Sequence, residues 1–331
     1  MYSLSTQAYG KDKVRLVRVK LLPADAASPH LTRHSVAEYS VQVLLEGAAF
    51  TASYTHADNS QVVATDTVKN TIYLVARRGS LGSPEAFARE LSENFLSAYS
   101  HVERVRVRVT QLRWTRIATT TLKPTEMPFS GSDAALQMRE RPGCSHPHSF
   151  VRDGDETRIA EMVASRTGAR GSPVEYALSA GLSNLLVLKT TGSSFENFHR
   201  CPNRTLPDMA DRLLSTSVEA FYTFAPSTTA PASDTVPYDA IFIAARQAIL
   251  DIFANHNSPS VQNTLFIMGT HILGLAPNLT SIRFALPNKH NFAVDLSRFG
   301  VKNEGKVGEG QTVFMPIDAP SGMQPLFFPL Y

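Results

Sequence analysis

The strict alternation of valine and arginine over residues 104–109 constrains the fold more than any other feature of this chain. The valines are Val105, Val107 and Val109, and the arginines are Arg104, Arg106 and Arg108. In a strand, side chains two residues apart share a face, so one face here is apolar and the other is charged. This pattern is typical of an antiparallel sheet that is covered on one side only. We interpret the arginine face as a solvated or interface surface, not as a stripe for nucleic acid.

The composition is that of a folded protein without a large excess of charge. Of 331 residues, 43% are hydrophobic and 18% are charged, and the formal net charge is +3. Proteins that bind nucleic acid concentrate basic charge on one face, and no apolar run here reaches the length of a membrane span. We therefore expect neither nucleic acid nor a membrane as a partner. The two cysteines, Cys144 and Cys201, form no metal or redox spacing.

The expected elements occur in the same order in the two halves of the chain. Each half reads as strand, strand, helix, helix, strand, strand, and we expect one unit over residues 1–150 and a second over residues 151–331. The helices come in adjacent pairs, which predicts an α+β fold with helices packed on one face of an antiparallel sheet. Residues 118–145 are rich in Thr, Pro, Ser and Gly, and we expect a surface insertion there.

The segment from Tyr54 to Tyr73 joins an expected strand, Ala49 to Tyr54, to an expected helix that begins near Thr65. We expect the Thr65 hydroxyl to cap this helix and Asp66 to lie in its first turn. An open helix N-terminus is a natural anion site, although the pattern by itself also fits a capped helix without any chemistry. Ser83-Pro84-Glu85 predicts the start of the next helix.

Several motifs, taken in this order, resemble the urate oxidase (uricase) family. The motifs are Tyr9-Gly10-Lys11, Ala57-Asp58-Asn59-Ser60, Val63-Ala64-Thr65-Asp66, Lys69-Asn70-Thr71, Asp211-Arg212-Leu213-Leu214-Ser215-Thr216, Ser260-Val261-Gln262 and Pro287-Asn288-Lys289-His290. The resemblance extends from about Tyr9 to Gly322. It implies two tandem tunnelling-fold (T-fold) units whose sheets assemble into a β-barrel around a tunnel. It also implies a homotetramer with active sites at the subunit interfaces.

The same resemblance implies an oxidoreductase that uses no cofactor and no metal. Such an enzyme converts urate, O2 and water to 5-hydroxyisourate and H2O2 in urate breakdown. The catalytic positions by resemblance are Lys11, Thr65 and His290. The substrate-binding positions by resemblance are Thr65, Asp66, Phe195, Arg212, Val261, Gln262 and Asn288.

Each of these residue types suits a flat anion with polar groups around its edge. Phe195 offers a stacking face, and Arg212 offers a planar fork that a lysine cannot reproduce. Gln262 presents a donor and an acceptor together. Lys11 beside a threonine hydroxyl favours removal of a substrate proton, and His290 can hold a proton near neutral pH.

Two alternatives remain open at this stage, and the chain departs from the family at two places, the insertion at 118–145 and the segment after Gly322. The chain could be another T-fold enzyme for a purine or pterin, or a purine-binding homologue with impaired catalysis. After Gly322, the prolines Pro325 and Pro329 are poor residues for a central strand, so the last strand is expected to be missing or remodelled.

We also expect a short helix from Asp208 to Leu214 and two final strands on either side of residues 286–292.

The localisation expected by resemblance is the peroxisome in a eukaryote and the cytoplasm otherwise. The end of the chain, Pro325 to Tyr331, does not carry a Ser-Lys-Leu type of signal.

Overall fold

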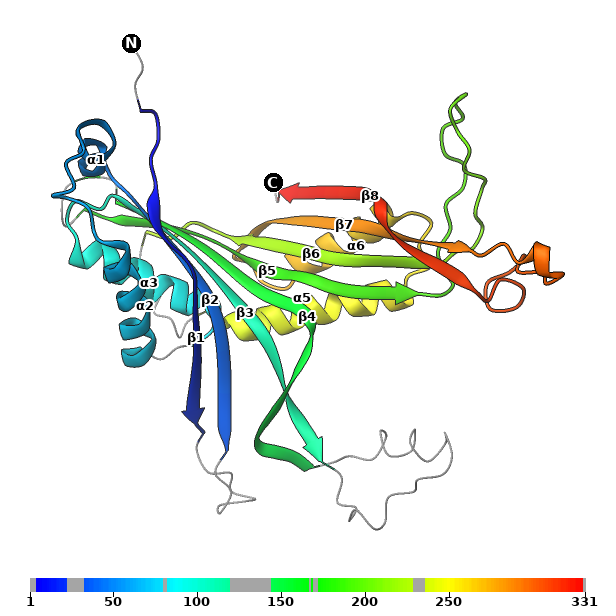
Figure 1. Ribbon diagram of the computed structural model, residues 1–331, viewed down its shortest axis with the longest axis horizontal. Helices are drawn as coiled ribbons and strands as arrows, with labels where there is room; N and C mark the ends of the chain where they lie inside the picture. Colours follow the sequence, from blue (N-terminus) through cyan, green and yellow to red (C-terminus); the bar gives the residue numbers. More distant parts are fainter. Residues whose placement is uncertain are drawn as a thin grey trace.

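The computed structural model describes residues 4–22, 33–79, 82–119, 144–166, 168, 172–228 and 236–329. Most of the expected insertion at 118–145 lies outside these residues. The described chain forms one antiparallel sheet of eight strands in sequence order, with β1 and β8 at its edges (Figure 1). The strands are β1 (Tyr9–Leu21), β2 (His34–Glu46), β3 (Arg104–Thr119), β4 (Cys144–Arg166), β5 (Val174–Lys189), β6 (Leu214–Phe224), β7 (Leu279–Ala293) and β8 (Phe314–Pro329).

Two pairs of longer helices follow β2 and β6. They are α2 (Thr65–Arg78) with α3 (Pro84–Ala98), and α5 (Tyr238–Asn255) with α6 (Val261–Leu273). The shorter helices are η1 (Ala48–Phe50), α1 (Thr51–His56) and η3 (Ser297–Phe299). The order strand, strand, helix, helix, strand, strand therefore occurs twice, and the predicted α+β fold is confirmed. The expected boundary between the two units, at residue 150, falls inside strand β4. The division into two units stays a prediction.

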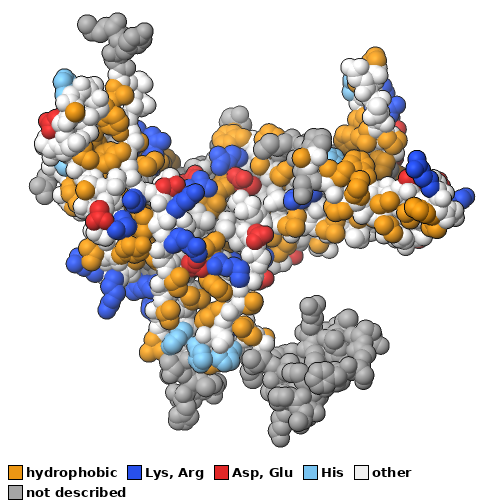
Figure 2. All heavy atoms as spheres, viewed as in Figure 1, with side chains coloured by type: hydrophobic (Ala, Val, Ile, Leu, Met, Phe, Trp, Pro, Cys, Tyr) orange, Lys and Arg blue, Asp and Glu red, His pale blue; other side chains and the backbone are white. Residues whose placement is uncertain are grey.

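The alternation in β3 separates a buried face from an open one. Val105, Val107 and Val109 are at most 1% exposed and belong to a continuous apolar core. The arginines between them are exposed, and they pair with acids of neighbouring strands: Arg104 and Arg106 with Glu46, and Arg108 with Glu161. Figure 2 shows basic and acidic side chains intermixed over the middle of the molecule. Exposed pairs of this kind contribute only about 0–1 kcal/mol each, so the buried face stabilises the sheet.

The segment before α2 is helical, and the strand expected from Ala49 to Tyr54 is wrong. The chain turns through η1 and α1 there because Phe50 is fully buried. Its ring packs edge-on against Tyr9 at 4.8 Å and His101 at 5.4 Å between centroids. Helix α2 does begin at Thr65, but its N-cap is Ala64, which makes no side-chain capping bond. The capping role expected for the Thr65 hydroxyl is therefore wrong.

Two expectations in the second half of the chain are also wrong. No helix forms from Asp208 to Leu214, because the backbone of Met209 pairs with Phe195 and β6 already begins at Leu214. Residues 286–292 do not separate two strands, since β7 runs through them with an irregularity between Asn288 and His290.

The last strand is present, contrary to the expectation of a missing or remodelled one. Strand β8 pairs with β7 as far as Ser281 opposite Pro329, and Pro325 lies opposite Ala285. Proline is tolerated here because an edge strand does not need every N–H for a ladder bond. Among the helices of the described ranges, none is long and apolar enough to cross a membrane.

A buried ion pair joins α3 to the central strand β4 on the covered face. Arg158 donates to both carboxylate oxygens of Glu85, at 3.2 and 2.7 Å, and to Asp239 at the start of α5 at 2.5 Å. The side chains of Arg158 and Glu85 are 9% and 1% exposed, whereas that of Asp239 is 69% exposed. Burial alone would lower the pKa of Arg158, but the two carboxylates raise it above its ordinary value. The arginine therefore remains charged and links both helix pairs to the sheet.

We predict that Glu85→Gln lowers the free energy of unfolding by about 3 kcal/mol or more, because it leaves the buried charge of Arg158 poorly compensated. Asp239→Asn is the matched control and should cost less than about 1 kcal/mol, since that carboxylate is mostly solvated. Unfolding in denaturant measures both values. Equal costs for the two substitutions would contradict the assignment of Glu85 as the main partner.

Candidate active site

The predicted catalytic Lys11 lies on β1 at an irregularity of the sheet. The register between β1 and β2 shifts between Lys11 and Val14, and Lys13 there has a positive φ of 54°. Gly10 precedes the lysine and passes so close to β2 that an added Cβ would lie 1.9 Å from the carbonyl oxygen of Val43. Only glycine fits this position, so the close contact of β1 with β2 fixes the backbone that carries Lys11.

Thr65 and Asp66 lie at the exposed N-terminus of α2, which packs against β1. The Asp66 carboxylate accepts bonds from Lys69 Nζ at 2.6 Å and Asn70 Nδ2 at 2.9 Å on its own helix. The bond from Lys69 lowers the pKa of Asp66 below its ordinary value. The first backbone N–H groups of a helix have no acceptor within it. This helix end can thus offer those N–H groups to an anion.

Tyr9 connects β1 to the segment that leads into α2. Its hydroxyl accepts a hydrogen bond from the backbone N–H of Val63 at 2.8 Å. Burial raises the pKa of Tyr9, so the hydroxyl stays protonated. From the motif Tyr9-Gly10-Lys11, a role was predicted for the lysine but not for Tyr9. In the structure Tyr9 connects the strand that carries Lys11 to the segment before Thr65. We call Lys11, Thr65 and Asp66 the first half-site.

Phe195 and Arg212 lie together in the connection between β5 and β6. Phe195 and Met209 exchange backbone hydrogen bonds of 2.8 and 3.0 Å, and the Arg212 N–H donates to the carbonyl of Ser193 at 2.8 Å. The Arg212 guanidinium carbon lies 5.2 Å from the centre of the Phe195 ring. Its buried Nε has no hydrogen-bond partner among the described residues, and burial lowers the pKa of this arginine. Part of its planar fork is therefore available to a ligand.

The residues Val261 and Gln262 form the first turn of α6. Ser260 caps this helix by accepting the N–H of Asn263 at 3.2 Å. Val261 is buried and Gln262 is exposed. Ser258, just before the cap, exchanges backbone bonds with Gly192 and Ser194 at 2.9 and 2.8 Å. The start of α6 is thus bonded to the segment that carries Phe195.

Asn288 and His290 lie on β7, beside the start of β6. Asn288 is opposite Thr216, whose hydroxyl donates to the carbonyl of Pro287 at 2.9 Å. The His290 ring stacks on that of Phe292, with 5.8 Å between centroids. We call the predicted residues of the second half of the chain the second half-site: Phe195, Arg212, Val261, Gln262, Asn288 and His290.

Within one chain the two half-sites are well separated. Strands β2, β3 and β4 lie between β1 and β5 in the sheet, and each step across a sheet is roughly 4.8 Å. Figure 1 shows β1 and α2 toward one end of the molecule and the connection after β5 toward the other. The structure therefore brings Phe195, Arg212 and the start of α6 together, and the two half-sites lie apart.

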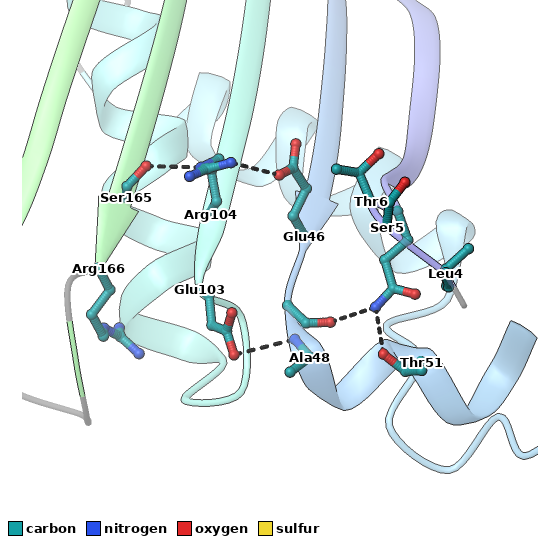
Figure 3. A pocket seen from close by; sticks show the side chains of 12 residues that line it. Leu4, Ser5, Thr6, Glu46, Ala48, Thr51, Glu103, Arg104, Ser165 and Arg166 are labelled. Atoms are coloured by element: carbon teal, nitrogen blue, oxygen red, sulfur yellow. Dashed lines mark hydrogen bonds and ion pairs between the residues drawn. The ribbon is translucent and has the colours of Figure 1, made fainter. Parts of the chain in front are cut away.

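A separate polar pocket of about 400 Å³ lies at the ends of β1 to β4 (Figure 3). Its polar groups mainly bond to one another, as in Arg104 with Glu46 at 3.1 Å and with Ser165 at 3.0 Å. It contains none of the predicted site residues. Among the described residues, no group of three or more His, Cys, Asp or Glu side chains is arranged to hold a metal ion.

Comparison with known proteins gives one family. The family model described as Uricase matches residues 7–163 and 178–324. The uricase of Cyberlindnera jadinii is 37% identical over 327 residues, which cover 97% of this chain and 95% of that protein. The uricase of Aspergillus flavus is 35% identical, with 98% and 95% covered. The crystal structure of uricase from Arthrobacter globiformis superposes with a TM-score of 0.77 at 31% identity, and covers 100% of this chain and 96% of that one.

The hydrogen bond between the Tyr9 hydroxyl and the Val63 N–H leads to a testable prediction for the first half-site. Tyr9→Phe leaves the N–H of Val63, a buried residue, without an acceptor, which costs about 1–3 kcal/mol. Hydrogen exchange at the Val63 amide should therefore become faster, and the segment before Thr65 should become more mobile. Tyr54→Phe, at an exposed tyrosine, is the control and should change nothing. Unaltered exchange at Val63 in the Tyr9 variant would contradict the role given to this hydroxyl.

Proposed function

We propose, on the premise that this chain belongs to the uricase family and is a urate oxidase, that it works without a cofactor. The proposed reaction converts urate, O2 and water to 5-hydroxyisourate and H2O2. Urate supplies two electrons and two protons to O2, which leaves as H2O2, and water then adds to the oxidised purine. Atoms and electrons balance without a further reductant.

The observation that carries the proposal is the pairing of Phe195 with Arg212. The guanidinium lies over the ring, 5.2 Å from its centre, so a flat molecule bound against Phe195 would also contact the arginine. The unpartnered Nε supports a ligand that accepts hydrogen bonds in its own plane. The pyrimidine-ring oxygen and nitrogen of urate meet both requirements. Gln262, exposed at the start of α6, would bind the opposite edge of that ring, beside the backbone of Val261.

Groups from both half-sites handle charge and protons in this proposal. The backbone N–H groups at Thr65 and Asp66 would bind the edge of the five-membered ring at the helix N-terminus. Lys11 with the Thr65 hydroxyl would accept a proton from urate. From the second half-site, His290 would relay a proton, and Asn288 would lie on the side of the ring where O2 reacts.

We further propose that the complete site forms between two subunits of a homotetramer. The separation of the half-sites within one chain supports this arrangement. The open edges at β1 and β8 support it too, as do the exposed apolar side chains of Val17, Val19 and Leu21 on β1. An interface that pairs the first half-site of each chain with the second half-site of its partner creates two equivalent sites.

Loss of urate absorbance with purified, chelator-treated protein tests the reaction. The proposal predicts turnover, with one H2O2 formed for each urate consumed. Activity that disappears on chelation and returns with zinc would indicate a metal-dependent T-fold enzyme instead. Urate binding without turnover would indicate a purine-binding homologue with impaired catalysis.

Lys11→Met and Thr65→Ala should each reduce kcat by about a hundredfold or more, because both remove a group that handles the substrate proton. KM should change far less, since neither side chain is assigned to hold urate in the ground state. Steady-state kinetics separates the two parameters. Wild-type kcat in both variants would show that the lysine–threonine assignment is wrong.

Arg212→Lys should instead weaken binding, because the lysine ammonium cannot form a bidentate pair. The loss of a charge-assisted pair is expected to cost about 1.5–3 kcal/mol. Titration with urate in the absence of O2 measures this cost directly. An unchanged dissociation constant would contradict the placement of urate against Arg212.

A further inference from the structure

The carboxylate of Asp211, next to Arg212, has hydrogen bonds on both oxygens. One oxygen accepts the Thr191 hydroxyl at 2.7 Å, and the other accepts the backbone N–H groups of Gly192 at 2.9 Å and Arg212 at 3.1 Å. Burial by itself would raise the pKa of Asp211, but these bonds and one from the Ser193 backbone lower it below its ordinary value. Asp211 therefore connects the chain leaving β5 to the chain entering β6.

These bonds close one end of a short two-stranded ladder. Phe195 and Met209 are paired at the other end by two backbone bonds, and Arg212 donates to Ser193 between them. Phe195 thus depends mainly on the Met209 end, and Arg212 depends on the Asp211 end. Gly192 has a φ of +74°, a conformation that glycine adopts without strain, and its N–H donates to Asp211 in that conformation.

Arg212 needs such support because its own side chain has little. Its Nε is buried without a partner, and no ion pair fixes its guanidinium to an acid within the described residues. The guanidinium of Arg212 contacts the Phe195 ring, with 5.2 Å to the ring centre. A contact with a ring face does not fix the rotation of the guanidinium. The part of Arg212 that hydrogen bonds hold in place is its backbone, and Asp211 accepts one of those bonds.

We propose that Asp211 is a positioning residue for the planar anion, acting through Arg212. It holds the arginine backbone against the chain leaving β5, so that the guanidinium meets the edge of a ligand stacked on Phe195. This inference rests on the proposed urate site. A general structural role would instead make Asp211 matter equally whether or not Arg212 is present.

A double-mutant cycle distinguishes these two roles. The measurement is the dissociation constant of urate in the absence of O2, for Asp211→Ala, Arg212→Ala and the double variant. Asp211→Ala should weaken binding about tenfold in the otherwise wild-type protein. In the Arg212→Ala background the same substitution should change binding by less than about twofold, because the residue through which it acts is gone. An equal loss in both backgrounds would overturn the proposal.

Two further variants test the chemistry of the anchor. Asp211→Asn keeps one acceptor oxygen, and its amide can donate to the Thr191 hydroxyl, so its affinity should stay within about threefold of wild type. Asp295→Ala is the matched control. This exposed carboxylate also accepts a backbone N–H, that of Ser297 at 2.9 Å, but lies outside the half-sites, and its loss should leave affinity unchanged. A loss in the Asp295 variant equal to that in the Asp211 variant would overturn the proposal.

The outcomes separate this inference from the proposed site. If Arg212→Ala leaves urate affinity unchanged, the site itself is misplaced. If Arg212→Ala weakens binding and Asp211→Ala does not, the site stands and the positioning role is wrong. If Asp211→Ala fails to fold, urate affinity is measured for Thr191→Val instead. This substitution, at an exposed position, removes one hydrogen bond to Asp211. That variant should weaken binding two- to threefold in the presence of Arg212 only, and an unchanged affinity would overturn the proposal.

Discussion

An eight-stranded antiparallel sheet with helices on a single face is the constraint on which the rest of this structure depends. The covered face contains the apolar core, so the protein does not rely on the charged face for stability. That face and the two edge strands remain free for assembly. Because the strands follow sequence order, residues early in the chain lie far from residues late in the chain. The wide sheet thereby separates the two half-sites.

Features that depend on local sequence were predictable. The alternation in β3 fixed its two faces, and Ser83-Pro84-Glu85 marked the start of α3, where Ser83 accepts the N–H of Ala86 at 3.3 Å. Two of the wrong expectations share one cause, which is a contact between residues that are distant in sequence. Phe50 turns the chain into a helix because it is buried between Tyr9 and His101. The stretch from Asp208 stays extended because Met209 pairs with Phe195.

In the candidate site too, features that depend on local sequence were predictable and those that depend on distant contacts were not. The residues of both half-sites were named from motifs, because their types and order resemble a known family. The residues that hold them in place were not. Tyr9 is hydrogen-bonded to Val63, which is 54 positions away, and Asp211 is hydrogen-bonded to Thr191 and Gly192, which are 20 and 19 positions away. A local sequence pattern cannot predict hydrogen bonds between residues so far apart, although Tyr9 and Asp211 both belong to motifs that resemble the family.

The central claim is that one complete site needs the first half-site of one subunit and the second half-site of another. Mixing a Thr65→Ala chain with an Arg212→Ala chain, under conditions that exchange subunits, tests it most directly. Each variant alone should be nearly inactive. In an equal mixture, half of the interfaces contain both chains, and each of these has one intact site and one doubly defective site. Urate turnover should therefore recover to about a quarter of the wild-type value. No recovery despite demonstrated subunit exchange would show that the site lies within a single chain.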